Sequence, residues 1–176
     1  HYFSADQRWA LDGQFMHSDV DGVTGSGFLG DVSYIPRQGT QHVVKATYID
    51  DQFDMNNVGF LTRNSQMNLD YNFMLTESNI PGIQSRTTRI SLINNYNTNR
   101  NPVLNGQSIG RAWNYLNNGS FEVSFLYLPK RVDDRLGRGT GDFRIPERFS
   151  LSSNYSSNPA RALAWSLSLE ATQEDL

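Results

Sequence analysis

The sequence of 176 residues contains no cysteine, which excludes disulfide frameworks, thiol catalysis and cysteine-ligated metal sites. It also has no apolar run close to the ~20 residues that a membrane-spanning helix requires. A helical membrane protein is therefore excluded. Its 15 basic residues are not clustered and are balanced by 18 acidic ones. We therefore expect no nucleic-acid partner, because such a partner requires a concentrated basic surface.

No stretch as long as a strand places its apolar residues at the 3.6-residue period of an amphipathic helix. Period-2 alternation of apolar and polar residues, in contrast, recurs along the whole chain. The clearest example is 121–127, where Phe121, Val123 and Phe125 alternate with Glu122 and Ser124. This pattern predicts an all-β fold with about nine strands. The predicted strands are 8–15, 28–34, 44–48, 68–75, 88–93, 112–116, 121–127, 149–155 and 162–170.

The predicted connections are roughly 11, 7, 19, 11, 18, 3, 19 and 6 residues long, each to within ~2–4 residues at the strand boundaries. They alternate between long and short, as in an antiparallel up-and-down meander whose long loops all lie at one end. That layout is typical of an outer-membrane β-barrel. The six prolines are predicted to lie in the connections, because proline cannot donate a hydrogen bond within a sheet.

The two sides of the predicted strands differ in a way that favours a transmembrane barrel. One side carries Leu, Phe, Trp and Tyr, and the other is rich in small and polar residues such as Ser166 and Ser168. A mean hydropathy of −0.54 does not contradict this, because a barrel exposes only every second side chain to lipid. The lumen-facing candidates on the polar side are Arg8, Asp12, Asp70 and Glu122.

We interpret residues 1–176 as a single segment and as a fragment of a larger barrel. Nine strands is an odd number, whereas bacterial single-chain barrels close with an even one. The polar residues 171–176 are predicted to lie beyond the last strand, and the chain starts at His1 without a leader. An internal piece of a longer protein is the expectation that these features favour.

Three segments carry recognisable motifs: residues 48–64, which contain Gly59-Phe60-Leu61-x-Arg63, residues 133–142, and Ile145-Pro146-Glu147-Arg148-Phe149. Together they resemble an uncharacterised bacterial family of predicted outer-membrane β-barrel domains. Its members carry, before the barrel, a module similar to carbohydrate-binding family nine. In 133–142, Thr140 interrupts the paired glycines of the family pattern. The resemblance implies the outer membrane as location and implies no catalytic residues.

The sequence offers no convincing catalytic or metal site. Asp19-Val20-Asp21-Gly22 resembles the start of a calcium loop but lacks its later ligands, so a turn is expected there. Asp133 and Asp134 are paired carboxylates of the kind that glycosidases use. Adjacent residues of an extended chain point to opposite faces, however, so we expect a salt-bridge cluster with the flanking arginines. The three histidines lack zinc-ligand spacing.

The sequence therefore predicts an outer-membrane β-barrel segment with a passive pore, transport or anchoring role and a link to glycan handling. Its expected partners are the lipid bilayer and glycans or a glycan-binding module. It is expected to be neither an enzyme nor a cofactor-binding protein. The alternative is a soluble carbohydrate-binding β-sandwich, in which exposed aromatic residues stack on sugars. The candidates for such stacking are Trp9, Trp113 and Trp165.

Overall fold

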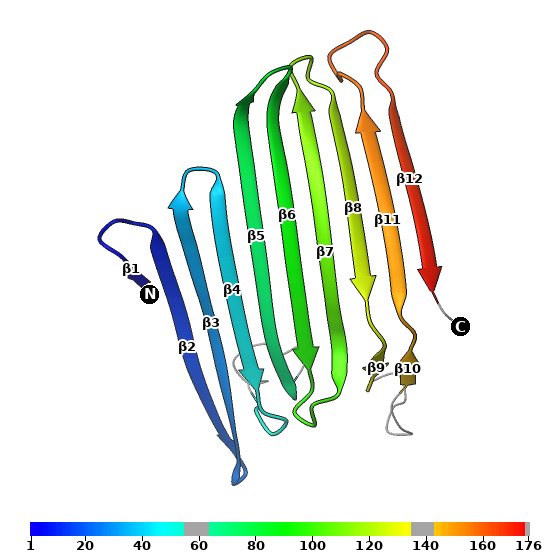
Figure 1. Ribbon diagram of the computed structural model, residues 1–176. Coiled ribbons are helices and arrows are strands. Elements are labelled where there is room, and N and C mark those ends of the chain that lie inside the picture. Colours follow the sequence, from blue (N-terminus) through cyan, green and yellow to red (C-terminus); the bar gives the residue numbers. More distant parts are fainter. Residues whose placement is uncertain (55–63, 135–142, 175–176) are drawn as a thin grey trace.

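The computed structural model describes residues 1–54, 64–134 and 143–174 (Figure 1). In these ranges the chain is all-β and contains no helix. Ten strands form one antiparallel sheet in the order β1-β2-β3-β4-β5-β6-β7-β8-β11-β12. Strands β9 and β10 pair with each other in a separate two-stranded sheet. The main sheet is therefore an up-and-down meander, as the alternation in the sequence predicts.

The strands of the main sheet are β1 (Tyr2–Phe3), β2 (Trp9–Val20), β3 (Val23–Arg37), β4 (Thr40–Ile49), β5 (Gln66–Ile80), β6 (Ile83–Tyr96), β7 (Pro102–Tyr115), β8 (Ser120–Leu128), β11 (Arg148–Ser156) and β12 (Ser166–Glu174). The hairpin strands are β9 (Arg131–Asp133) and β10 (Phe143–Ile145). Every predicted strand has a counterpart in the main sheet. The short β1 at one edge is the additional strand that sequence periodicity does not indicate.

The strands are longer than predicted, so several expected loops are tight turns. Residues 21–22, 38–39 and 81–82 are the whole connections after β2, β3 and β5. The two longest connections in the main sheet, 50–65 and 129–147, leave the same end of the sheet (Figure 1). The predicted alternation of loop length is wrong in detail, because the turn at 21–22 lies at that end and the longer loop 157–165 at the other.

Backbone conformation explains two of the tight connections. Asp21 and Gly22 both have positive φ, 55° and 80°, which is the requirement of a type I′ turn between twisted strands. This geometry confirms a turn where the sequence also resembled a calcium loop. Asn118, with φ 62°, donates its backbone N–H to the carbonyl of Tyr115 in the turn between β7 and β8. The short connection predicted between 112–116 and 121–127 is therefore a tight hairpin turn.

Two boundary predictions are wrong. Pro36 lies inside β3 and Pro102 begins β7, so the prolines are not all in connections. Proline is tolerated at both places. Pro36 falls within a register irregularity between Tyr34 and Arg37, and Pro102 is the first residue of its strand, where no ladder hydrogen bond from its nitrogen is needed. The last strand starts later and ends later than predicted, so that residues 171–174 belong to β12.

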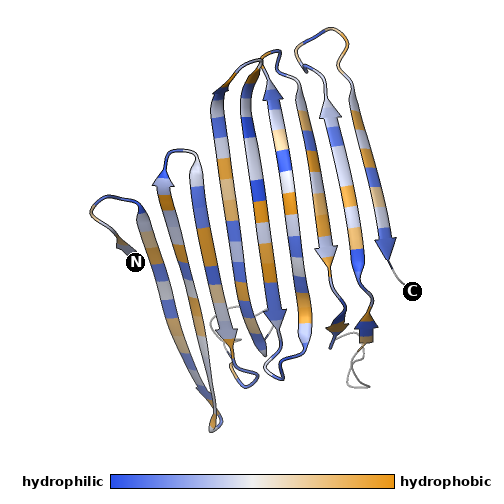
Figure 2. Cartoon of the chain, viewed as in Figure 1, coloured by the Kyte–Doolittle hydropathy of each residue, from blue (hydrophilic) through white to orange (hydrophobic). Residues whose placement is uncertain are grey.

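The main sheet has one polar and one apolar face, and the register defines them, because directly opposed residues of neighbouring strands share a face. Hydrophilic and hydrophobic bands alternate along the strands (Figure 2). We call the side that carries Trp9, Phe28, Tyr71, Phe125 and Leu167 the apolar face. The polar face carries Asp12, Lys45, Ser91, Glu122 and Ser168. Some apolar side chains, such as Leu29 and Val43, also lie on the polar face.

The sheet is open, with β1 and β12 as its two edges, and in the described ranges no second layer covers either face (Figure 1). Only two apolar side chains of this part of the chain are buried, Ile49 at 3% exposure and Phe53 at 4%. The structure therefore has almost no hydrophobic core of its own.

Two parts of the sequence resemblance lie outside the described residues. Gly59-Phe60-Leu61-x-Arg63 falls in 55–63, and most of the 133–142 stretch falls in 135–142.

Candidate functional site: the two faces of the sheet

Three of the four residues predicted to face a lumen lie on the polar face. Asp12 is opposite Asp31 in β3, Asp31 is opposite Lys45 in β4, and Lys45 is opposite Asp70 in β5. These four side chains form a transverse row across β2 to β5. A cross-strand row with one cation among three carboxylates has a net negative charge. His1 also contacts Asp12, through its Nδ1 and a carboxylate oxygen.

Glu122 lies three strands away from Asp70, on the same face. Its Oε1 is 3.8 Å from Nη1 of Arg89 in β6, although β7 runs between them. The pair spans β7 because the intervening residues are small: Gly110 is opposite Arg89 and Ala112 is opposite Glu122. Both charged side chains are about half exposed, so the ion pair contributes little to stability. Its charges remain accessible to solvent.

Arg8 is not on the sheet. It precedes β2 in a turn, where its Nε lies 3.7 Å from an oxygen of Asp6 and its carbonyl accepts a hydrogen bond from Ile35 N–H. Hydrogen bonds from the Ser4 hydroxyl and the Arg8 backbone N–H lower the pKa of Asp6 below its ordinary value. Of the four predicted residues, Asp12 and Asp70 thus belong to the row across β2 to β5. Glu122 lies apart from that row on the same face, and Arg8 lies in a turn at the sheet edge.

The connection after β4 folds onto the polar face, which sequence reasoning did not predict. Phe53 lies over Gly25 of β3, and Asp54 N–H donates a 3.0 Å hydrogen bond to Ser18 Oγ of β2. Gly25, Ser18 and Ile49 all belong to the polar face, because Gly25 is opposite Ser18 and Ile49 is opposite Gly27. The start of this loop therefore covers one end of the polar face. The signal in the sequence is Gly25-Ser26-Gly27, two glycines on one side of a strand.

The acidic residues of this loop have structural partners. Asp50 accepts a 2.9 Å hydrogen bond from Gln52 N–H, and this bond, with a further one from Asp51, lowers the pKa of the Asp50 carboxyl. The Asp51 carbonyl accepts from the Asn64 amide at 2.7 Å. These hydrogen bonds close the loop on itself.

The apolar face carries most of the large exposed hydrophobic side chains of the sheet. Their exposed fractions reach 73% for Phe15 and 61% for Leu169. Exposed apolar patches of this extent mark a contact surface for a protein or a membrane. The exposed members are Tyr2, Trp9, Leu11, Phe15, Phe28, Val44, Tyr48, Leu69, Leu92, Ile109, Phe125, Phe149, Leu151, Leu167 and Leu169.

Aromatic pairs lie near the strand ends of this face. At the end where β7 joins β8, the rings of Trp113 and Phe121 are stacked at 5.5 Å, and those of Tyr155 and Trp165 are 4.8 Å apart. Near the other ends of β8 and β11, Tyr127 stacks on Phe149 at 4.6 Å. In β8, Phe121 and Tyr127 are six residues apart, a span of roughly 20 Å along a strand.

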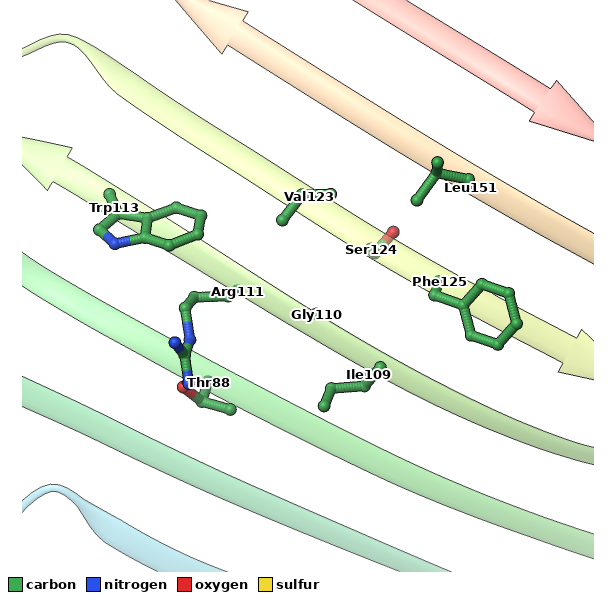
Figure 3. Close-up of a pocket in the computed structure, with 9 residues that line it drawn as sticks. All are labelled: Thr88, Ile109, Gly110, Arg111, Trp113, Val123, Ser124, Phe125 and Leu151. Atoms are coloured by element: carbon green, nitrogen blue, oxygen red, sulfur yellow. The ribbon is translucent and has the colours of Figure 1, made fainter.

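A shallow hollow of about 410 Å³ interrupts the apolar face between β6 and β11 (Figure 3). Its walls are formed by Ile109, Trp113, Val123, Phe125 and Leu151. One cation lies among these side chains. The cation is Arg111 of β7, and its guanidinium lies beside Thr88 of β6 (Figure 3).

The described residues contain no group of three or more His, Cys, Asp or Glu side chains that could hold a metal ion. His42, for example, is hydrogen-bonded through Nδ1 to the Tyr71 hydroxyl at 2.9 Å. Asp134 accepts a 3.0 Å hydrogen bond from the amide of Asn97. The described part of the chain contains no helix, and therefore no helix that could cross a membrane. No family model, curated protein or solved structure matches the chain.

Proposed function

We propose that the chain is a segment of an outer-membrane β-barrel with its apolar face against lipid and its polar face toward an aqueous lumen. The observation that carries this proposal is the distribution of exposed hydrophobic side chains. They cover one face of a single-layer sheet that has almost no core of its own. Such a face requires an apolar environment, because leaving it in water forfeits the free energy of burial.

Strand length supports a membrane-spanning role. Nine strands of the main sheet have 9 to 15 residues each. A transmembrane strand needs about 9–11 residues. The aromatic pairs near both ends of β8 and β11 match the aromatic girdles that flank the apolar band of a barrel.

Two features of the polar face support the proposed lumen: its composition and the loop that folds onto it. Serines at positions 91, 108, 124, 152 and 168 line this face, along with the charged row from Asp12 to Asp70. Small and polar side chains suit the inside of a barrel. On this proposal the start of the loop after β4, where Phe53 lies over Gly25, projects into the lumen and narrows it, as an inward-folded loop narrows a pore.

The open edges are compatible with a segment of a larger barrel. Lipid cannot satisfy the backbone groups of an open edge strand, so β1 and β12 must gain partners in the membrane. In a ten-stranded antiparallel meander the first and last strands run in opposite directions. Antiparallel partners, either further strands or each other, therefore fit both edges. On this proposal the role is passive: a pore, a transport channel or the anchor of a glycan-binding module.

The alternative is a soluble carbohydrate-binding β-sandwich. Trp9 at 42% and Trp165 at 55% exposure offer ring surface of the kind that sugars stack on. A sandwich also needs a second sheet packed on the first, and in the described ranges the second sheet has only the short strands β9 and β10. The single layer therefore favours the barrel.

The experiment that separates the two functions is heat-modifiability of the full-length protein in isolated outer membranes. A compact band in unheated samples that shifts on boiling is the expected result, because inserted barrels resist detergent until heated. A protein found only in the soluble fraction, with no shift, would contradict the barrel and make glycan binding the next assay.

A further inference from the structure

Arg111 is a cation on the apolar face. It is opposite Val123 in β8 and Thr88 in β6, and its neighbours along the same side of β7 are Ile109 and Trp113. Its guanidinium Nε donates a 3.1 Å hydrogen bond to Thr88 Oγ1 (Figure 3). In the described part of the chain no carboxylate lies within ion-pair distance of this guanidinium. Its two terminal amino groups therefore remain available to an external anion.

A second arginine on the same face shows the contrast. Arg86 of β6 is opposite Glu77 in β5, and its Nη2 lies 2.9 Å from Glu77 Oε2. The charge of Arg86 is thus neutralised within the chain. Among the described residues no carboxylate compensates the charge of Arg111, which lies beside the hollow lined by Ile109, Phe125 and Leu151.

The position of Arg111 near the end of β7 suits contact with the headgroup of a membrane lipid. Trp113, two residues further along β7, belongs to the aromatic pair with Phe121 near the strand end. In a barrel this aromatic level lies at the membrane–water interface. An arginine just inside it can direct its guanidinium to that level while its stem stays among apolar side chains.

We propose that Arg111 and its hollow bind an anionic membrane lipid. The guanidinium takes the headgroup phosphate, for which its fork of N–H donors is well suited, and an acyl chain lies in the apolar hollow. The proposal rests on the membrane orientation of the apolar face. It adds a ligand class and a site that the barrel alone does not require.

The test uses the full-length protein refolded into phosphatidylcholine vesicles, with every tryptophan other than Trp113 replaced by phenylalanine, Trp9 and Trp165 included, so that Trp113 is the one fluorescent donor. Energy transfer is measured from Trp113 to a trace of acceptor-labelled phosphatidylglycerol, or to the same acceptor on phosphatidylcholine. We expect transfer to favour phosphatidylglycerol, with a relative association constant of roughly fivefold for one arginine at an anionic lipid.

Two variants identify the residue responsible. Arg111→Gln should abolish the preference and Arg111→Lys should keep part of it, because lysine retains the charge without the planar fork. Arg89→Gln is the matched control: it removes one positive charge from the opposite face and should leave the preference unchanged. A preference that survives Arg111→Gln, or one that Arg89→Gln removes equally, would overturn the site.

The remaining outcomes separate this proposal from the proposed function. Absence of transfer to either labelled lipid would contradict the membrane orientation of the apolar face, and the Arg111 site with it. Equal transfer to both lipids would keep the membrane orientation and reject the site. Inorganic phosphate is added as competitor. If inorganic phosphate at the same concentration as phosphatidylglycerol displaces the labelled lipid, the acyl chain adds nothing to binding and the lipid assignment is wrong.

Discussion

Phe53 covers Gly25 so closely that a Cβ on Gly25 would overlap its backbone and lie 2.6 Å from the carbonyl carbon of Gln52. This contact holds the loop after β4 against the polar face. Because the obstructing atoms are backbone, a side chain at position 25 can be accommodated only if the loop moves.

Gly25→Ala should therefore release the loop and expose Phe53. We expect a loss of about 1–3 kcal/mol in the free energy of unfolding, as for overpacking at other close contacts. Protease cleavage between residues 50 and 65 should become faster. The matched control is Gly13→Ala in β2, where the nearest atom to the added Cβ is 3.9 Å away. Equal stability and equal cleavage of the two variants would contradict the importance of this contact.

The membrane orientation predicts opposite tolerance of charge on adjacent residues of β12. Leu169, which is 61% exposed, lies on the apolar face, and Ser168 lies on the polar face. Leu169→Lys should cost the inserted state up to ~2–4 kcal/mol, as a cation on a lipid-facing strand does at the bilayer midplane. Ser168→Lys should cost little, because it faces water in the lumen.

The measurement is the fraction of heat-modifiable, folded protein in vesicles over a urea series. In a soluble protein the same two substitutions would both fall on exposed positions and would differ little. Identical curves for the two variants would therefore argue against lipid contact.

Charge at Glu122 should set ion preference without determining the fold. Glu122→Lys replaces a half-exposed acid that lies 3.8 Å from Arg89, so loss of the ion pair should change stability by only about 0–1 kcal/mol. In a conducting pore it should shift the reversal potential toward anions. Glu122→Gln should give a smaller shift in the same direction. An unaltered reversal potential in both variants would remove Glu122 from the conducting path.

The loop that carries Asp50 should depend on pH. The hydrogen bond from Gln52 N–H lowers the pKa of Asp50, so its ionised form is favoured in the folded state. The resulting stabilisation is complete above the pKa of the unfolded chain and is lost as pH falls through the lower, folded pKa. Protease cleavage of the loop should increase only in that acidic range.

The control for this pH dependence is Asp50→Asn, which cannot titrate at this position. Its cleavage should lack the acid-dependent step that Asp50 contributes. An NMR titration in which the Asp50 carboxyl changes at or above its ordinary pKa would contradict the expected shift.

Periodicity in the sequence was sufficient to predict the class, the meander and every long strand of the sheet. Periodicity underestimated strand ends, because segments such as His17-Ser18-Asp19 are polar on both sides and carry no period-2 signal. It also placed Asp12, Asp70 and Glu122 correctly on one face, since alternation fixes side-chain direction within a strand. Their lumenal role stays a prediction.

What the sequence did not reveal depends on contacts between distant residues. The packing of Phe53 on Gly25 joins a loop to a strand two elements earlier, and no local pattern encodes it. Arg111 was missed for a similar reason. Its position is notable only because the register opposes it to Val123 and no carboxylate of the described residues faces it.

The nearest-neighbour order of the main sheet has a consequence for the rate at which it forms. Most strands pair with the strand just before them, and the turns at 21–22, 38–39 and 81–82 close with the shortest possible loops. Hairpins of this kind form in about 1–10 μs in isolation. Folding can therefore begin at several tight turns and extend strand by strand. The slowest closure should be the junction of β8 with β11, because the connection 129–147 is the longest loop that must close in the main sheet.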